Sequence, residues 1–154
     1  MAHILIVDDD ELIAEIASEV LIDKGHACGW VTSAEAAWRL LHRGRRPDLL
    51  LLDQNMPGIS GITFLRRLRG SPQHYDLPVI MFTAMSGEGD EAQAIYAGAQ
   101  DYVRKPFDPA KLTNCVSRLL VKRSASPQHK PLQTWLREQN QLERANAVPA
   151  RRMV

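Results

Sequence analysis

Five polar side chains in this chain could form one charged pocket, because each follows a short apolar segment. They are Asp8, Asp9, Asp53, Thr83 and Lys105. The carboxyl ends of parallel strands share one edge of a sheet, and ligands bind at that edge in open α/β sheets. Carboxylates beside a lysine and a hydroxyl suit a divalent metal ion and a phosphoryl group. The sequence therefore predicts a site for both ligands where these segments end.

The aspartates have two interpretations at this stage. Adjacent carboxylates repel each other, and a cation beside Asp8 and Asp9 would relieve that cost. Alternatively, Asp8, Asp9 and Asp10 cap the next helix, and Asp10 suits that role better. Asp53 follows four leucines, and a nearby metal would keep it ionised as a nucleophile able to form an acyl phosphate. The alternative for Asp53 is a strand-end acid in an Asx-turn.

The remaining polar residues carry weaker signals when each is taken alone. The constrained turn Asn55-Met56-Pro57-Gly58, with Gly61, could present the Asn55 carbonyl oxygen to a metal, although such loops are common. Thr83 could donate its hydroxyl to a phosphoryl oxygen, or simply be a β-branched strand end. Lys105 could lie on the surface, or a cis bond to Pro106 could turn it into the pocket. Their order at successive strand ends is what favours a shared site.

The segments that must position these residues alternate between strand and helix five times. Apolar runs predict strands over about residues 4–7, 27–31, 49–52, 78–83 and 101–103. Apolar stripes predict helices over about residues 13–21, 32–42, 62–69 and 90–97, and from 109 onward. Lys24-Gly25 is expected to stop the first helix, a capping box of Thr32 and Glu35 to start the second, and Asp108 to cap the last. Residues 86–89 are expected to form a loop.

This alternation predicts an α/β fold with a parallel sheet covered by helices on both faces. The domain is expected to span residues 1–123, which is long enough for its own core. Residues 124–154 are expected to form a linker or tail, with a short amphipathic helix at about residues 131–146. From Lys122 onward, seven Lys or Arg stand against two Glu, so the tail is basic and the rest is mildly acidic.

Composition is typical of a soluble globular protein, with 45% hydrophobic and 24% charged residues. Cys28 and Cys115 belong to no C-x-x-C motif, so we expect two reduced cysteines in the core. No apolar run approaches the ~20 residues that span a bilayer. The apolar segment at residues 4–7 is too short for a signal peptide. These features together predict a cytoplasmic protein.

Four segments resemble the receiver domain of two-component response regulators, the CheY-like family. They are Ile4-Leu-Ile-Val-Asp-Asp9, Asp53-Gln-Asn-Met-Pro-Gly58, Thr83-Ala84 and Lys105-Pro106-Phe107. The resemblance covers about residues 2–122 and implies a flavodoxin-like sheet of five parallel strands in the order 2-1-3-4-5.

The resemblance also implies roles for the site residues. Asp53 would accept a phosphoryl group from a histidine kinase or a histidine phosphotransfer protein. Mg²⁺ would be bound by Asp9, Asp53 and the backbone carbonyl of Asn55, with Asp8 holding a metal-bound water. Thr83 and Lys105 would contact the phosphoryl oxygens. Tyr102 would be an aromatic switch that turns inward as Thr83 moves.

In this interpretation the protein is a phosphoacceptor signalling domain, with self-phosphotransfer and autodephosphorylation as its only chemistry. Phosphorylation would switch a partner-binding surface built from residues 90–97, residues 101–103 and the helix that begins at Pro109. The output partner is not identified by the sequence, and a homodimer through this surface is one expectation. The tail is too short for a typical DNA-binding domain and shows no recognition motif, so nucleic acid is not an expected partner.

Two other functions remain as alternatives. Residue 154 could be the point where a longer multidomain signalling enzyme is truncated, leaving only its receiver module. A haloacid-dehalogenase-like phosphatase also combines acids, a hydroxyl and a lysine on a parallel sheet. Its Asp-x-Asp pattern is matched by Asp8-x-Asp10, but Leu12 stands where a threonine would follow and no cap insertion is present.

Overall fold

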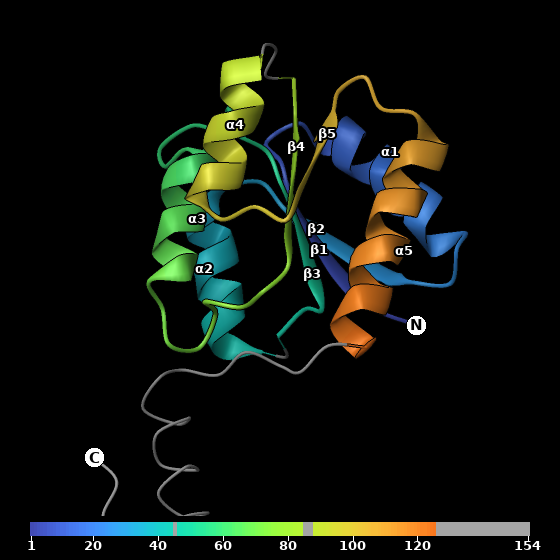
Figure 1. The fold of residues 1–154 in the computed structure, drawn as a ribbon, viewed down its shortest axis with the longest axis horizontal. Coiled ribbons are helices and arrows are strands. Elements are labelled where there is room, and N and C mark those ends of the chain that lie inside the picture. The colour runs from blue at the N-terminus through green and yellow to red at the C-terminus, as the bar shows by residue number, and fades with distance from the viewer. Residues whose placement is uncertain (45, 85–87, 126–154) are drawn as a thin grey trace, which may run out of the picture.

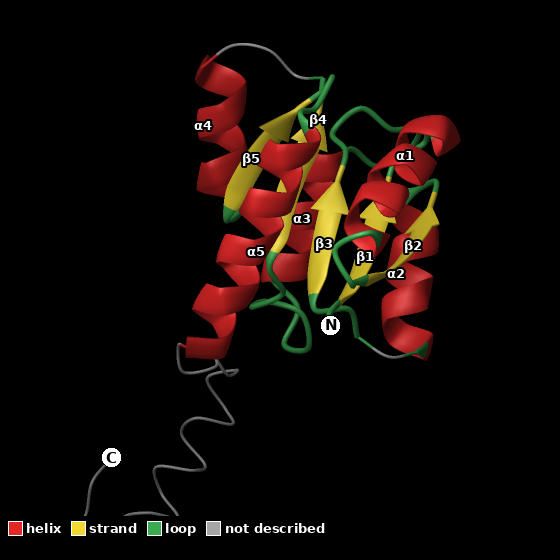
Figure 2. Ribbon diagram, turned by 90° about the vertical axis from the view of Figure 1, so that its right-hand side faces the viewer, coloured by secondary structure: helices red, strands yellow, loops and turns green. Residues whose placement is uncertain are grey.

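Five parallel strands form one sheet at the centre of the computed structural model, which describes residues 1–44, 46–84 and 88–125. The strands are β1 (His3–Val7), β2 (Ala27–Val31), β3 (Leu49–Leu52), β4 (Val79–Thr83) and β5 (Asp101–Arg104). Their order is β2-β1-β3-β4-β5, and they can be followed in Figure 2. The predicted fold class and strand order are confirmed.

Helices cover both faces of this sheet, as parallel connections require (Figure 1). The helices are α1 (Glu11–Ile22), α2 (Ala34–Arg43), α3 (Gly61–Arg69), α4 (Glu88–Ala97) and α5 (Pro109–Ala125). Helices α1 and α5 lie on one face, while α2, α3 and α4 lie on the other. Every loop that leaves the carboxyl end of a strand therefore opens on the same edge of the sheet.

The sheet separates two hydrophobic cores, and this explains the unbroken apolar runs in the sequence. Leu50 and Leu52 of β3 point into the core under α2, α3 and α4. Leu49 and Leu51 point into the core under α1 and α5. All four side chains are fully buried, as expected for a strand covered on both faces.

Helix caps agree with the sequence at most positions. The Asp10 side chain accepts from the backbone N–H groups of Leu12 and Ile13 at the start of α1, and Asp108 accepts from Ala110 at the start of α5. The capping box of Thr32 and Glu35 is wrong by one residue. Ser33 caps α2, accepting from the backbone N–H of Ala36. Two neighbouring hydroxyl residues can both serve as caps, and local sequence does not set the register between them.

Helix α4 begins earlier than predicted. Glu88 and Gly89 belong to it, so the expected loop over residues 86–89 is wrong for its second half, and residues 86–87 lie outside the described part. A glycine in an exposed first turn costs only about 1 kcal/mol, which the other residues of α4 tolerate. Helix α5 extends to Ala125, two residues past the predicted domain end. The predicted helix at residues 131–146 also lies outside the described residues.

The two cysteines are free. Cys115 belongs to α5 and is buried in the core that this helix covers, whereas Cys28 is only half-buried on the edge strand β2. Over the described ranges, none of the helices has both the length and the apolar character that crossing a membrane requires.

Candidate functional site

The carboxyl ends of β1 and β3 bring three aspartates together. Single oxygens of Asp8, Asp9 and Asp53 all lie within 4.8 Å of one another. Asp8 is fully buried, Asp53 is 5% exposed, and Asp9 is open to solvent. The backbone N–H of Asp53 donates to the Val7 carbonyl at 2.9 Å. The hydrogen bonding of the sheet therefore continues to Asp53 and fixes the position of its backbone. Two of the three acids are therefore held in the protein interior while the third faces incoming ligands.

Lys105 balances part of this negative charge. Its Nζ forms a short ion pair with Asp8 and lies 3.6 Å from Oδ2 of Asp53. Its side chain is only 12% exposed, and its backbone N–H donates to the Thr83 carbonyl at 3.0 Å. The peptide bond from Lys105 to Pro106 is cis. The ammonium thus lies between two carboxylates that come from different strands.

The pKa of Asp53 lies above its ordinary value, with burial as the largest cause. The Lys105 ammonium lowers this pKa, and the Asp8 carboxylate raises it. Hydrogen bonds from the Thr83 side chain and from the Asn55 backbone also lower the pKa of Asp53. Burial and repulsion outweigh the attractive contacts, so an additional cation in the site would favour the ionised carboxylate.

The donor atoms fit a hard divalent cation. Carboxylate oxygens are the ligands that Mg²⁺ uses, usually one or two at a time with several waters retained. The exposed position of Asp9 leaves room for such waters. No thiol or imidazole belongs to this cluster within the described residues, and soft ligands would have favoured other metals.

The turn after β3 depends on a close approach between Gly61 and the Asp53 backbone, for which the sequence carries no local signal. A Cβ atom at Gly61 would lie 2.2 Å from the carbonyl oxygen of Asp53. The Gly61 N–H donates to the Gln54 carbonyl at 3.0 Å, and the Gln54 side chain accepts from the N–H of Ile62 at 2.7 Å. Gly58 takes a φ of 81°, as its predicted turn role requires. These contacts fix the backbone on which Asp53 and Asn55 lie.

Thr83 and Tyr102 occupy different places relative to the aspartates. Thr83 is fully buried at the end of β4, and its side chain is hydrogen-bonded to Asp53. Tyr102 lies on β5 opposite Met81, half-buried against the core under α4. Burial raises the pKa of its phenol. The structure therefore gathers Asp8, Asp9, Asp53, Thr83 and Lys105, with Asn55 in the adjoining turn, whereas Tyr102 stands apart on a neighbouring strand.

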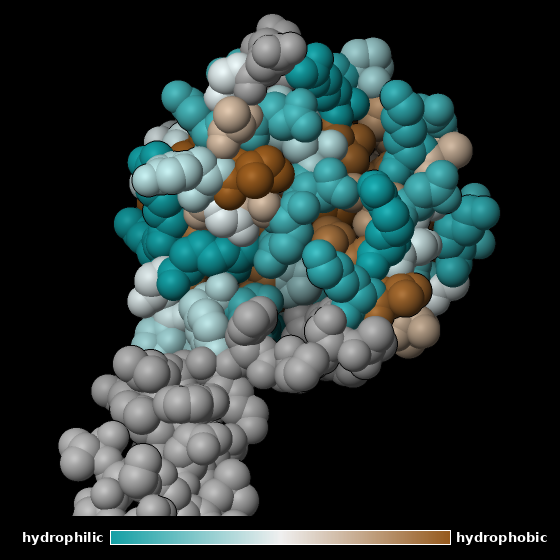
Figure 3. All heavy atoms as spheres, in the orientation of Figure 1, coloured by the Kyte–Doolittle hydropathy of each residue, from teal (hydrophilic) through white to brown (hydrophobic). Residues whose placement is uncertain are grey.

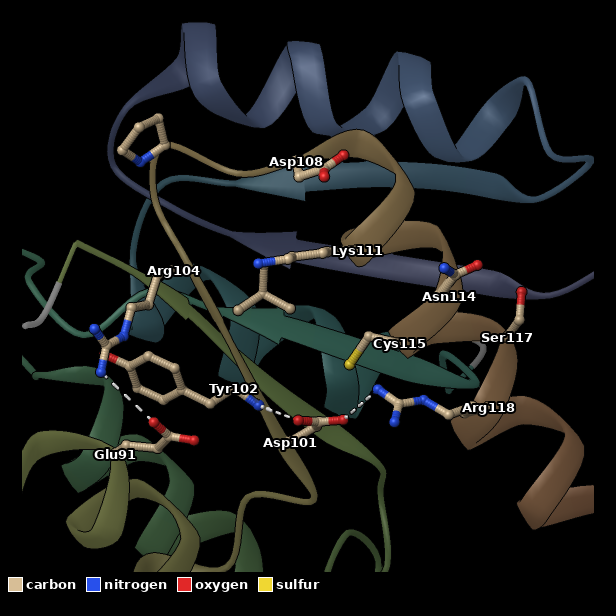
Figure 4. A pocket seen from close by; sticks show the side chains of 12 residues that line it. Glu91, Asp101, Tyr102, Arg104, Asp108, Lys111, Asn114, Cys115, Ser117 and Arg118 are labelled. Atoms are coloured by element: carbon tan, nitrogen blue, oxygen red, sulfur yellow. Dashed lines mark hydrogen bonds and ion pairs between the residues drawn. The ribbon is translucent and has the colours of Figure 1, made fainter. Parts of the chain in front are cut away.

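A groove of about 890 Å³ runs between α4, β5 and α5. Tyr102, Arg104 and Arg118 line it, and Figure 4 shows their side chains with two acidic partners. Arg104 pairs with Glu91 at 3.6 Å and Arg118 with Asp101 at 3.2 Å. Hydrophobic side chains are visible in the hollow between the α4 and α5 sides (Figure 3). The groove lies on the surface that the sequence predicts to be switched.

Comparisons with known proteins give a consistent result. The family of response regulator receiver domains matches residues 4–117. The chain is 35% identical over 130 residues to the phosphate regulon transcriptional regulatory protein PhoB of Pseudomonas aeruginosa, covering 84% of this chain and 56% of PhoB. It thus spans about half the length of the curated relatives it matches.

Solved structures agree with the sequence relatives. A crystal structure described as a response regulator of Chloroflexus aurantiacus is 36% identical, with a TM-score of 0.74 over 78% of this chain and 98% of that one. The receiver domain of a signal transduction histidine kinase from Syntrophus aciditrophicus is 32% identical, with a TM-score of 0.75 over 84% and 98%. With this sheet order and with a match across most of its length, the chain belongs to the response regulator receiver domain family of two-component systems.

Proposed function

We propose that Asp53 accepts a phosphoryl group in a Mg²⁺-dependent reaction. The observation that carries this proposal is the surroundings of its carboxylate. It is nearly buried at a strand end, 3.6 Å from the Lys105 ammonium, hydrogen-bonded to Thr83, and beside the oxygens of Asp8 and Asp9. Asp9 is more exposed, and Asp8 is already paired with Lys105. Asp53 is therefore the acid best placed to act as a nucleophile.

Asp8, Asp9, Asp53 and the Asn55 carbonyl would hold the magnesium ion. When bound, the ion supplies positive charge that offsets the carboxylates and the phosphoryl oxygens. The hard-oxygen chemistry of the acidic cluster supports this assignment. The raised pKa of Asp53 supports it as well, because burial and Asp8 disfavour the ionised carboxylate that a cation would favour.

Phosphoryl transfer requires little covalent chemistry from the protein and depends mainly on positioning and charge. One Asp53 oxygen forms a bond to phosphorus while the bond from phosphorus to the donor nitrogen breaks, and the electron pair remains on that nitrogen. Lys105 and the Thr83 hydroxyl then bind separate phosphoryl oxygens. The donor would be a phosphohistidine of a histidine kinase or a phosphotransfer protein, which fits the family to which the chain belongs.

The output would be a change in the surface formed by α4, β5 and α5. A phosphorylated side chain carries about −1.5 to −2 charges at neutral pH, so the Thr83 hydroxyl would move its hydrogen bond from the Asp53 carboxylate to a phosphoryl oxygen. Tyr102 would then change its position on β5, and a partner or a second copy of the chain would bind the altered groove. The ion pair between Arg104 and Glu91 lies in this surface and is half exposed, so it contributes less than about 1 kcal/mol and opposes the change only weakly.

We further propose that the receiver unit ends with α5 at Ala125, two residues past the expected boundary at 123, and that the basic sequence after it is a linker. PhoB is named as a transcriptional regulatory protein, so transcription is one output to test, whereas the residues of this chain provide no nucleic-acid motif. The free thiols of Cys28 and Cys115 support a reducing compartment such as the cytoplasm.

The test is the intact mass of the full chain after incubation with acetyl phosphate, with Mg²⁺ or with EDTA. A gain of about 80 Da that requires Mg²⁺ and is absent from Asp53→Asn is expected. Asp48→Asn is the matched control, because Asp48 precedes β3 at the opposite edge of the sheet, where it accepts from the His3 backbone at 2.8 Å. Equal gains in Asp53→Asn and wild type would refute the assignment of Asp53.

A further inference from the structure

Helix α4 is attached to the domain by small side chains and by contacts at its two ends. Over residues 89–97 the buried side chains are Ala94 and Ala97, whereas Ile95 and Tyr96 are 46% and 91% exposed. Burying alanine removes much less apolar surface from water than burying leucine or phenylalanine. The neighbouring helix α3 buries three such large side chains. The position of α4 must therefore depend strongly on how its ends are held.

The carboxyl end of α4 closes in a Schellman turn. Gly98 takes a φ of 114°, and its N–H donates to Ile95 at 3.0 Å. The N–H of Ala99 donates to Ala94, also at 3.0 Å. The carbonyl oxygen of Gly98 accepts two hydrogen bonds from Arg69, at 3.0 Å from Nε and 2.7 Å from Nη2. The end of α4 is thus bound to the last residue of α3.

Every N–H donor of the Arg69 guanidinium has a partner. Nη1 donates to the carbonyls of Tyr75 and Leu77, at 3.1 and 2.8 Å. Nη2 also donates to Oε1 of Gln100 at 3.0 Å, and the same oxygen accepts from the backbone N–H of Val79 at 2.7 Å. One planar side chain therefore connects the end of α3, the start of β4 and the turn from α4 to β5. Such charge-assisted bonds are stronger than neutral ones.

Among the described side chains in the amino-terminal half of α4, Glu91 holds the helix to β5 through an exposed ion pair. Glu91 pairs with Arg104 at 3.6 Å, and both side chains are about half exposed, at 51% and 50%. The Arg104 guanidinium also lies 5.9 Å from the Tyr102 ring. Figure 4 shows this pair at the edge of the groove. Exposed ion pairs of this kind hold their partners only weakly, so the two ends of α4 are attached unequally.

We propose that Arg69 is a positioning residue that fixes the carboxyl end of α4, so that the switch displaces only its amino-terminal half. The inference rests on the proposed phosphorylation of Asp53, whose added charge would act on Thr83 at the end of β4. The helix would then tilt about Gly98. The surface near Glu91 and Arg104 would change, whereas the surface near Gly98 would stay constant.

The test is amide hydrogen exchange by NMR on the full chain, with and without beryllium fluoride and Mg²⁺ as a phosphoryl mimic. Arg69→Lys keeps the charge but loses the planar fork. Arg67→Lys is the matched control, because Arg67 is exposed and lies 5.8 Å from the Trp38 ring instead. In wild type and control, we expect Gly98 and Ala99 to remain protected in both states, and the mimic-induced changes within α4 to be confined to residues 88–93.

In Arg69→Lys the Gly98 and Ala99 amides should exchange about 10-fold faster or more, and the mimic-induced changes should extend through residues 94–99. Gly98→Ala should reproduce this with Arg69 intact, because its Cβ would lie 2.8 Å from the Arg69 Nε at a φ of +114°. The proposal would be overturned if the Gly98 amide of Arg69→Lys exchanged at the same rate as in the wild-type protein. Equal acceleration of the Ala17 and Leu21 amides in α1 would also overturn it, because that would indicate general destabilisation.

The outcome separates this inference from the proposed function. Resonances of Asn55 and Thr83 report whether the mimic occupies the site at Asp53. If they do not respond, the phosphoacceptor role loses support. The comparison of Arg69→Lys with wild type in the untreated protein still tests whether Arg69 holds the end of α4, and mimic-induced changes that reach Gly98 in wild type would refute a fixed end.

Discussion

Replacement of Gly61 by alanine should damage both the fold and the site. The new Cβ atom would lie 2.2 Å from the Asp53 carbonyl oxygen and 2.9 Å from the Gln54 Cα. Ordinary contacts begin at 3.4 Å, so the backbone that carries Asp53 would have to move by about 1 Å. These atoms belong to the backbone at the end of a central strand, so they cannot move aside as a flexible side chain would.

The expected magnitude follows from two opposing terms. Overpacking of this kind costs about 1–3 kcal/mol, and the rigid surroundings of Gly61 place it near the upper end. Position 61 begins α3, and the higher helix propensity of alanine offsets at most about 1 kcal/mol of the overpacking cost. We expect a net loss of about 2 kcal/mol in the free energy of unfolding, which lowers Tm by roughly 5–10 °C. Because a displacement of about 1 Å can cost 100-fold in rate, phosphorylation by acetyl phosphate should slow by about 10- to 100-fold.

Urea unfolding and a time course of intact mass measure both effects. Gly29→Ala is the matched control, because its Cβ would meet nothing within 4 Å on the exposed strand β2. That variant should stay within about 0.5 kcal/mol of wild type or be slightly more stable. The reasoning is refuted if Gly61→Ala unfolds at the wild-type urea concentration and gains phosphate at the wild-type rate.

Three further predictions follow from buried ionisable groups. Lys105→Met leaves the carboxylates of Asp8 and Asp53 without their cation, so the free energy of unfolding in EDTA should fall by about 3 kcal/mol. Mg²⁺ should restore part of this loss. An unchanged free energy of unfolding would contradict the claim that Lys105 offsets the charge of the two carboxylates. Burial raises the pKa of Cys115 to about 12, so iodoacetamide at pH 8 should label Cys28 first; equal labelling rates in the native protein would count against this. Burial lowers the pKa of His74, with Arg46 and His42 adding to the effect. The unfolded chain then binds this proton more readily, so stability should fall as pH drops below about 6.5, and the decrease should be smaller in His74→Phe.

Much of the fold could be predicted because its signals are local and repeated. The four leucines of β3 predicted a strand buried on both faces, and each core receives alternate residues of it. The alternation of strand and helix then predicted parallel pairing, which brings Lys105 to Asp8 although 97 residues separate them. The apolar pattern and the parallel topology together were therefore sufficient to predict the contact between Lys105 and Asp8.

Other contacts left no local signal. Thr32 and Ser33 are both good caps, and the structure uses Ser33. Arg69 resembles any cation in the last turn of a helix, yet its main acceptor is the carbonyl of Gly98, 29 residues later. The need for glycine at position 61 depends on how closely Asp53 approaches, which only the folded chain determines.

The most direct test of the central claim is chemical identification of the modified residue. Borohydride reduces an aspartyl phosphate to homoserine. Protein that is treated with acetyl phosphate and Mg²⁺ and then reduced with borohydride should therefore contain one peptide about 14 Da lighter than its unmodified form. We predict that fragmentation places this change at Asp53, and that EDTA abolishes it. Reduction at Asp8 or Asp9 instead, or a phosphorylated protein with no reducible aspartate, would contradict the assignment of Asp53 as phosphoacceptor.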